Sequence, residues 1–203
     1  MGDVHIIEEL IAQISRNLKQ VKKVNWLIKG YQINALDQIT HLNISKIALK
    51  GKWPPALFKL ENLEFLDIQQ NDLDCIPEEI SQLKKLKCLD IRNNHLSSLP
   101  DSVMNIHGLT KLYLGNNIFT AIPKILSCCQ NLEIIDFTDN QIYGGTEYLL
   151  QSKSITNIYL RNNLIRTFPF HSIKSGQLLE LNVMENPITT VPTELPVIGN
   201  FLY

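Results

Sequence analysis

Apolar positions along most of the chain repeat with a period of 23 residues. Each unit carries an apolar triplet in the spacing L-x-x-L-x-L, and an asparagine follows three positions after the triplet. These asparagines are Asn71, Asn94, Asn117, Asn140, Asn163 and Asn186. A fixed period of this length predicts a solenoid of stacked coils. The alternation within each triplet predicts a short strand whose apolar side chains face the interior.

The second half of each unit reads x-L-x-x-L-P, with prolines in phase at Pro77, Pro100, Pro123, Pro169 and Pro192. Proline here is expected to stop the strand and begin an extended arc on the convex side. In the fifth unit Gly145 and Thr146 replace the apolar residue and proline, and Tyr148, Leu149 and Leu150 follow, which predicts a turn of helix. An earlier unit over residues 39–60 has Ile47 in place of the asparagine, giving seven repeats over residues 39–195.

This LxxLxLxxNxLxxLP form resembles the leucine-rich repeat family, in particular the intracellular Ras-pathway scaffold proteins and bacterial effector proteins delivered into host cells. The resemblance implies an α/β solenoid, shaped as a horseshoe with a parallel β-sheet on its concave side. It also implies that the six asparagines form a ladder that pairs backbone groups of adjacent coils. Because one repeat cannot bury its own apolar face, both ends of the stack need covering.

The two ends of the chain are expected to provide this cover. Residues 1–38 are predicted to form a helical cap, with apolar residues at helical spacing at Ile7, Ile11, Ile14, Leu18, Val21 and Ile28. Five positive charges and no acid lie between Arg16 and Lys29, which leaves open that this helix docks on acidic lipid. Residues 196–203 are interpreted as a capping tail or the point where a longer protein was cut.

The composition fits one elongated domain of 203 residues, with 44% hydrophobic residues and a net charge of −1. This charge gives no overall field that favours nucleic acid. No stretch approaches the roughly 18 apolar residues of a membrane span, and the N-terminus lacks the apolar block of a secretory signal. The four cysteines do not cluster at the ends, so we expect a reducing, intracellular compartment, the cytoplasm of the source or of a host cell.

No group of residues indicates catalysis, a metal site or a cofactor. Cys88 and His95 are seven residues apart on an extended run, so roughly 20 Å should separate them, too far for a catalytic pair. Cys129 occupies an apolar position and is expected to be a buried small hydrophobe. We therefore expect a non-enzymatic protein without a cofactor.

The strand positions that face solvent on the concave side are the candidate partner site, because aromatic and arginine side chains there are typical of binding hot spots. The candidates are Phe65, Asp67, Asp90, Arg92, Lys111, Tyr113, Ile134, Asp136, Tyr159, Arg161 and Met184. Asp67 and Asp90 have a second interpretation, since L-D-L is a common form of the motif and the carboxylates can serve solubility alone. The mixture of charges argues against nucleic acid.

The sequence therefore predicts a protein-interaction module, monomeric on its own, that holds a protein partner on its concave face. It would act as a scaffold, a targeting subunit or an inhibitor that covers the active site of a partner enzyme. An alternative is the substrate-recognition domain of a larger effector enzyme such as a ubiquitin ligase. A weaker alternative is binding to a membrane surface through the basic N-terminal helix.

Overall fold

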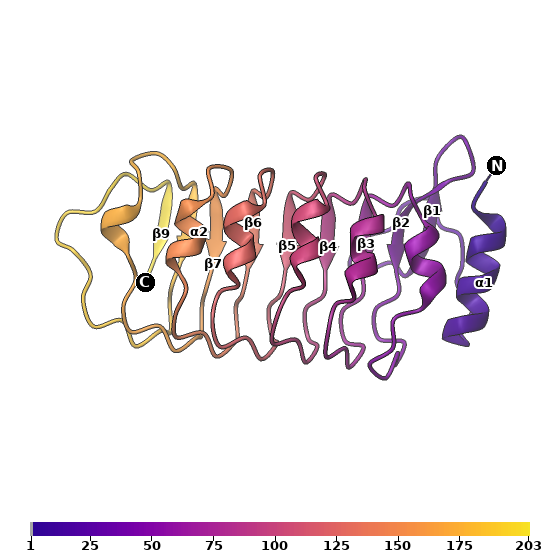
Figure 1. Cartoon of the computed structure of the whole chain (residues 1–203), viewed down its shortest axis with the longest axis horizontal. Helices are drawn as coiled ribbons and strands as arrows, with labels where there is room; N and C mark the ends of the chain where they lie inside the picture. The colour runs from indigo at the N-terminus through magenta and orange to yellow at the C-terminus, as the bar shows by residue number, and fades with distance from the viewer. Residues whose placement is uncertain (1) are drawn as a thin grey trace.

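The strands of successive coils form one continuous sheet along the molecule (Figure 1). The computed structural model describes residues 2–203. The strands are β1 (Gly30–Ile33), β2 (Ile39–Asn43), β3 (Phe65–Asp67), β4 (Cys88–Asp90), β5 (Lys111–Tyr113), β6 (Ile134–Asp136), β7 (Asn157–Tyr159), β8 (Glu180–Asn182) and β9 (Asn200–Leu202). Strands β2 to β9 pair in parallel in chain order, and β1 is antiparallel to β2. The leucine-rich repeat solenoid predicted from the period is confirmed.

The central residue of each short strand points into the core. Leu66 pairs with Leu89 and Leu89 pairs with Leu112, and all three are fully buried. One unbroken row of apolar side chains therefore runs through the stack, as the 23-residue period requires.

The convex side carries short helices where the sequence predicted extended arcs. They are the 3-10 helices η1 (Pro55–Lys59), η2 (Glu78–Gln82), η3 (Asp101–Asn105), η4 (Lys124–Cys128) and η5 (Phe170–Ser172), and the α-helix α2 (Glu147–Gln151). A proline precedes each 3-10 helix, as Pro77 does with a φ of −76°. Proline has a fixed φ close to the helical value, so it starts a helix as readily as it ends a strand. The helical turn predicted for the fifth coil is confirmed by α2.

The N-terminal helix is shorter than predicted. Helix α1 (Val4–Ile14) ends at Ser15, which adopts the left-handed conformation with a φ of 52°. The chain then runs without helix to β1, and the backbone of Tyr31 exchanges hydrogen bonds with Lys19 and Val21. The helical spacing of Leu18, Val21 and Ile28 was misleading. Within the described residues, the segment from Arg16 to Lys29 is not helical, so the basic helix of the membrane hypothesis is not formed there.

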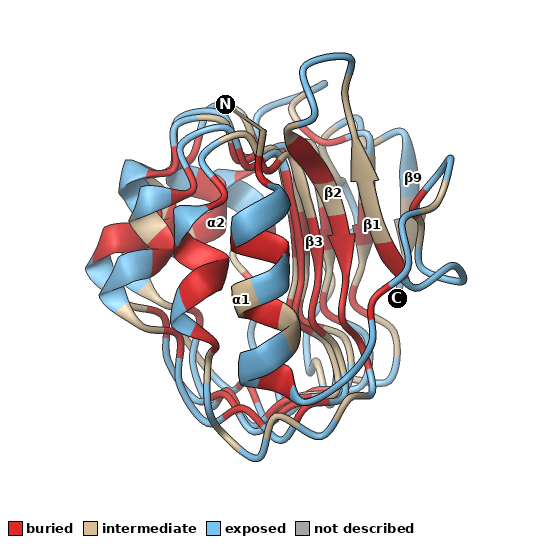
Figure 2. Ribbon diagram, turned by 90° about the vertical axis from the view of Figure 1, so that its right-hand side faces the viewer, coloured by how far each residue is buried: buried red, intermediate tan, exposed pale blue. Residues whose placement is uncertain are grey.

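Helix α1 packs against the first coil, at the end of the stack (Figure 2). Its residue Leu10 is fully buried in the common core. Gln13 accepts a hydrogen bond from the backbone N–H of Ala56 (2.9 Å), and Glu9 forms an ion pair with Lys59 (2.7 Å). Apolar and polar contacts thus join α1 to η1 and cover the apolar surface of this coil.

All six predicted asparagines form the ladder. The Asn117 Nδ2 group donates to the carbonyls of Leu114 (3.0 Å) and Ile91 (3.2 Å), while its Oδ1 accepts from the N–H of Leu96 (2.9 Å). The other five amides make the same kind of contacts in their own coils. Each asparagine therefore pairs backbone groups of its own coil and of the preceding one.

The C-terminal segment adds a strand that the sequence did not predict. Strand β9 pairs in parallel with β8, with Phe201 opposite Leu181, so this coil spans 20 residues, whereas the coil from β2 to β3 spans 24 and those from β3 to β8 span 23. No helix among residues 2–203 has the length and apolar character needed to cross a membrane.

Candidate functional site

The concave face of the sheet carries the candidate site, and its strands are in the predicted register. Asp67 pairs with Asp90, Asp90 with Tyr113, Tyr113 with Asp136 and Asp136 with Tyr159. These side chains therefore form one row across the sheet, at the roughly 4.8 Å spacing of neighbouring strands.

Asp67 and Asp90 were expected to face solvent, but both are fully buried. Asp67 Oδ2 accepts hydrogen bonds from Asn43 (3.0 Å) and Gln69 (3.1 Å). Burial, together with the neighbouring carboxylate of Asp90, raises the pKa of Asp67 to about 6. These carboxylates are part of a covered polar network, so neither interpretation of them as exposed groups holds.

Arg92 forms an ion pair within the chain. Its guanidinium donates two hydrogen bonds to the carboxylate of Asp90, at 2.9 and 2.6 Å, in the bidentate geometry that holds an arginine most firmly. The hydrogen bonds to Asp90 raise the pKa of Arg92. The guanidinium also lies 5.3 Å from the ring centroid of Tyr113. Arg92 therefore neutralises Asp90 and orients Tyr113.

Trp26, which was not among the predicted site residues, packs on the N-terminal half of the face. Its ring lies 5.9 Å from Phe65 and 6.0 Å from Tyr113 between centroids, both edge to face. Phe65 is on β3 and Tyr113 on β5, so Trp26 lies over β4. Burial raises the pKa of Tyr113 to about 12. Phe65 and Tyr113 were expected to be exposed for a partner, but both pack against Trp26 of the same chain.

Residues 22–29, which we call the Trp26 loop, hold this tryptophan through their own hydrogen bonds. Asn25 Oδ1 accepts from the backbone N–H groups of Leu27 and Ile28 (both 2.9 Å), which closes a tight turn. The carbonyl of Asn25 accepts from Asn43 (2.8 Å), whose side chain also binds Asp67. Leu27 at the tip is 92% exposed. The loop is thus joined to the buried carboxylates through one asparagine.

The C-terminal half of the face is more open. Ile134, Asp136, Tyr159 and Met184 are partly exposed and Arg161 is exposed. Tyr159 donates a hydrogen bond to Glu180 (2.6 Å), which fixes its phenol. Arg161 forms an ion pair with Glu185. Lys111, on the strand before this region, is partly exposed. This surface is the part of the predicted site that remains available to a partner.

The cysteines have little nucleophilic character where they are buried. Burial raises the pKa of Cys88 to about 12 and that of Cys129 to about 11. Cys129 is buried in the core, as predicted, while Cys75 and Cys128 are exposed. Within residues 2–203 no three His, Cys, Asp or Glu side chains are grouped so that they could hold a metal ion.

Short parallel strands, convex helices and an asparagine ladder define the class of protein: a leucine-rich repeat solenoid, a fold of protein-interaction modules that is typically non-enzymatic. The family described as leucine-rich repeat region matches residues 32–149, and the chain belongs to the leucine-rich repeat family. No curated protein matches the chain.

Solved structures show the same fold. A leucine-rich repeat protein of Leptospira interrogans matches with a TM-score of 0.63 and 22% identity, over 80% of this chain and 55% of that one. An internalin (inlF) of Listeria monocytogenes matches with a TM-score of 0.64 and 20% identity, over 85% and 51%. The PEPR1–AtPEP1 structure matches with a TM-score of 0.63 and 20% identity, over 91% and 31%. The chain thus spans about half, or less, of these proteins.

Proposed function

We propose that the chain binds a protein partner on the open part of its concave face, formed by strands β6 to β9. The observation that supports this proposal is the combination of Ile134, Tyr159 and Met184, which are apolar or aromatic and partly exposed. Ile134 is on β6, Tyr159 is on β7, and Met184 lies two residues after β8. Side chains of this kind supply most of the binding energy at protein interfaces. Their replacement by polar residues would leave the inward-facing core unchanged.

The site is preorganised, which favours tight association. Tyr159 is held by Glu180 and Arg161 is paired with Glu185, so little side-chain freedom is lost when a partner binds. Asp136 uses one carboxylate oxygen to accept from the N–H of Thr138 (2.8 Å). The carboxylates outnumber Arg161 here, which favours a partner with an apolar patch beside a positively charged group.

Binding would give the chain the role of a scaffold, a targeting subunit or an inhibitor that covers a partner enzyme. A second proposed role is the recognition part of a larger effector enzyme such as a ubiquitin ligase. The four free thiols support a reducing, intracellular setting for either role. The second role requires a larger protein than the first, so the mass of the endogenous protein on an immunoblot distinguishes the two roles.

The test is affinity capture with a Tyr159→Ala/Arg161→Ala bait. The matched control is Tyr143→Ala/Arg166→Ala, which removes the same two residue types at exposed positions outside the concave strands. A protein captured by the wild type and the control is expected to be lost from the concave-face variant. With that protein purified, the Kd should rise on the order of tenfold or more, as for a hot-spot residue.

Equal Kd values for the wild type, the concave-face variant and the control would refute the assignment to this face. Melting temperatures within a few degrees of the wild type would show that both variants remain folded.

A further inference from the structure

Positive charge is concentrated at the N-terminal end of the stack. Residues 16–59 contain nine of the 19 Lys and Arg residues and one of the 20 acidic residues, Asp37. The rest of the chain therefore has ten Lys and Arg against 19 Asp and Glu. A net charge near zero conceals a strongly basic end and an acidic remainder.

Backbone contacts bring cations from three segments together. The N–H of Tyr31 donates to the carbonyl of Lys19 (3.0 Å), and Gly30 pairs with Asn43 across β1 and β2. A Cβ atom on Gly30, whose φ is +125°, would lie 2.2 Å from the carbonyl oxygen of Lys19, so only glycine permits this approach. Lys29 precedes Gly30 and Lys46 follows β2, so the fold places both beside Lys19.

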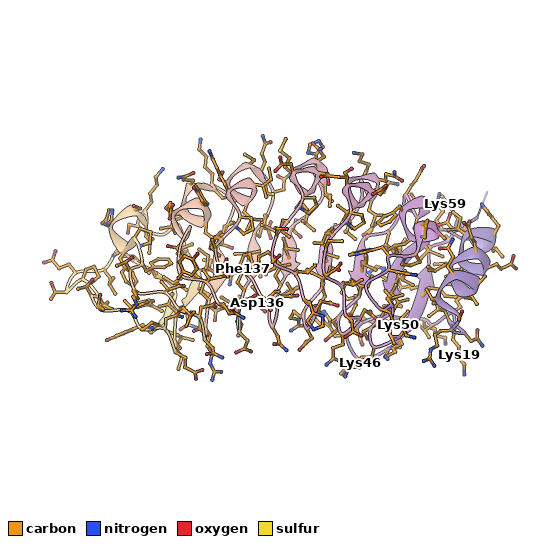
Figure 3. The ribbon with its side chains drawn as sticks, turned by 60° about the horizontal axis from the view of Figure 1, so that its bottom comes forward. Lys19, Lys46, Lys50, Lys59, Asp136 and Phe137 are labelled. Carbon is orange, nitrogen blue, oxygen red and sulfur yellow. The ribbon has the colours of Figure 1, made fainter. Side chains whose placement is uncertain are left out.

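These cations surround a depression with a volume of about 520 Å³. Its charged lining residues are Arg16, Lys19, Lys29 and Lys46, and its other lining residues are uncharged. Figure 3 shows Lys19 and Lys46 on the same side of the stack, with Lys59 on the opposite side among the helices.

The four cations have no partner of opposite charge. All four are exposed, and in the described chain, residues 2–203, none of their side chains forms an ion pair or a hydrogen bond. Two other surface lysines do pair with acids, Lys59 with Glu9 and Lys87 with Glu64. A hollow lined by one sign of charge concentrates the field and attracts counterions.

We propose that this depression binds a compact ligand carrying two or more phosphate groups. Lysine binds phosphate as a point charge with three donors, and several lysines around one hollow can each contact a different phosphate oxygen. An extended nucleic acid would need a positive track, but the surface beyond residue 59 is acidic in balance. The site lies outside the open part of the concave face, so it is separate from the proposed partner site.

The test is isothermal titration calorimetry of the full chain with inositol hexakisphosphate as the probe. We expect one binding site, with an affinity that falls as salt is added. Lys19→Glu/Lys46→Glu should weaken binding on the order of tenfold or more, because it removes two charge-assisted contacts to phosphate and adds two negative charges. The matched control Lys124→Glu/Lys153→Glu makes the same change of net charge at exposed lysines outside the depression and should leave the affinity nearly unchanged.

Vesicles distinguish a soluble ligand from a lipid headgroup. Co-sedimentation with vesicles that contain phosphatidylinositol 4,5-bisphosphate, lost in Lys19→Glu/Lys46→Glu alone, would support the site and identify a headgroup as the source. Calorimetric binding without co-sedimentation would support the site and identify a soluble ligand. Three outcomes would overturn the proposal. The control pair could weaken binding of the probe as much as Lys19→Glu/Lys46→Glu does, or the chain could bind phosphatidylserine vesicles of the same charge equally well. The third outcome is no binding to either probe.

Discussion

Removal of the Trp26 side chain should make the thiol of Cys88 reactive. Cys88 lies on β4, between the strands whose Phe65 and Tyr113 contact Trp26, and it is 9% exposed. Thiol reagents attack the thiolate, so both access and pKa limit the reaction. Trp26→Ala removes the indole that lies over this strand and lets water reach it.

The magnitude follows from the pKa of Cys88. Burial, followed by the carboxylate of Asp90, raises this pKa to about 12. A free cysteine has a pKa of ~8.5, so at pH 8 the thiolate of Cys88 is depleted by a factor of roughly 10³. Asp90 and Asp67 remain in Trp26→Ala and keep part of the shift. We therefore expect the reaction rate of Cys88 to rise by at least about tenfold and to stay below that of a free thiol.

The assay is the time course of reaction with Ellman's reagent at pH 8. The wild type should show two fast thiols, from the exposed Cys75 and Cys128, while Trp26→Ala should show a third, slower thiol that Cys88→Ser removes. Trp53→Ala is the matched control, because Trp53 packs on Phe58 away from the concave face. An unchanged rate for Cys88 in Trp26→Ala, or the same increase in Trp53→Ala, would refute the view that the loop shields β4.

Two further predictions concern stability. Asn117→Ala should lower the free energy of unfolding by about 3 kcal/mol, because the N–H of Leu96 and buried carbonyls lose their partner. Asn186 makes the same contacts but is half-buried, so Asn186→Ala should lower the free energy of unfolding by about 1 kcal/mol. Equal losses in urea unfolding would contradict the role of burial in the ladder. The folded-state pKa of Asp67, about 6, lies above its ordinary value of 3.8, so the stability that protonated Asp67 contributes is complete below pH 3.8 and is lost as the pH rises through 6. Relative to Asp67→Asn, the wild type should therefore gain on the order of 1 kcal/mol between pH 7 and pH 4, and a constant difference would refute this assignment.

The repeating part of the fold was predictable because each coil sets its own conformation and touches only its neighbours. The position of Asn117 in the ladder and the burial of Leu89 follow directly from the period. The same regularity places Tyr159 and Asp136 on adjacent strands. The convex helices were missed because proline both ends strands and begins helices, and the sequence around it does not distinguish the two outcomes.

The candidate site was less predictable because its first half is shaped by residues far away in sequence. Asp67 is buried by groups that include Asn43 and, through it, the loop carbonyl of Asn25, some 40 residues earlier. A repeat pattern contains no information about a segment outside the repeats. The signals available were Trp26 beside a turn-forming asparagine and the acid-free run of cations from Arg16 to Lys29. Three cations of that run line the depression, and Lys46 joins them only in space.

The Trp26 loop links two surfaces that would otherwise be independent. Trp26 lies on the concave aromatic side chains, and Lys29, three residues later, lines the basic depression. If an anion that occupies the depression changes how firmly the loop holds Trp26, thermodynamic linkage requires that displacement of Trp26 change the affinity for the anion by the same factor. A short loop would then couple two binding equilibria, and the concave surface presented to a partner would depend on the concentration of a small charged molecule.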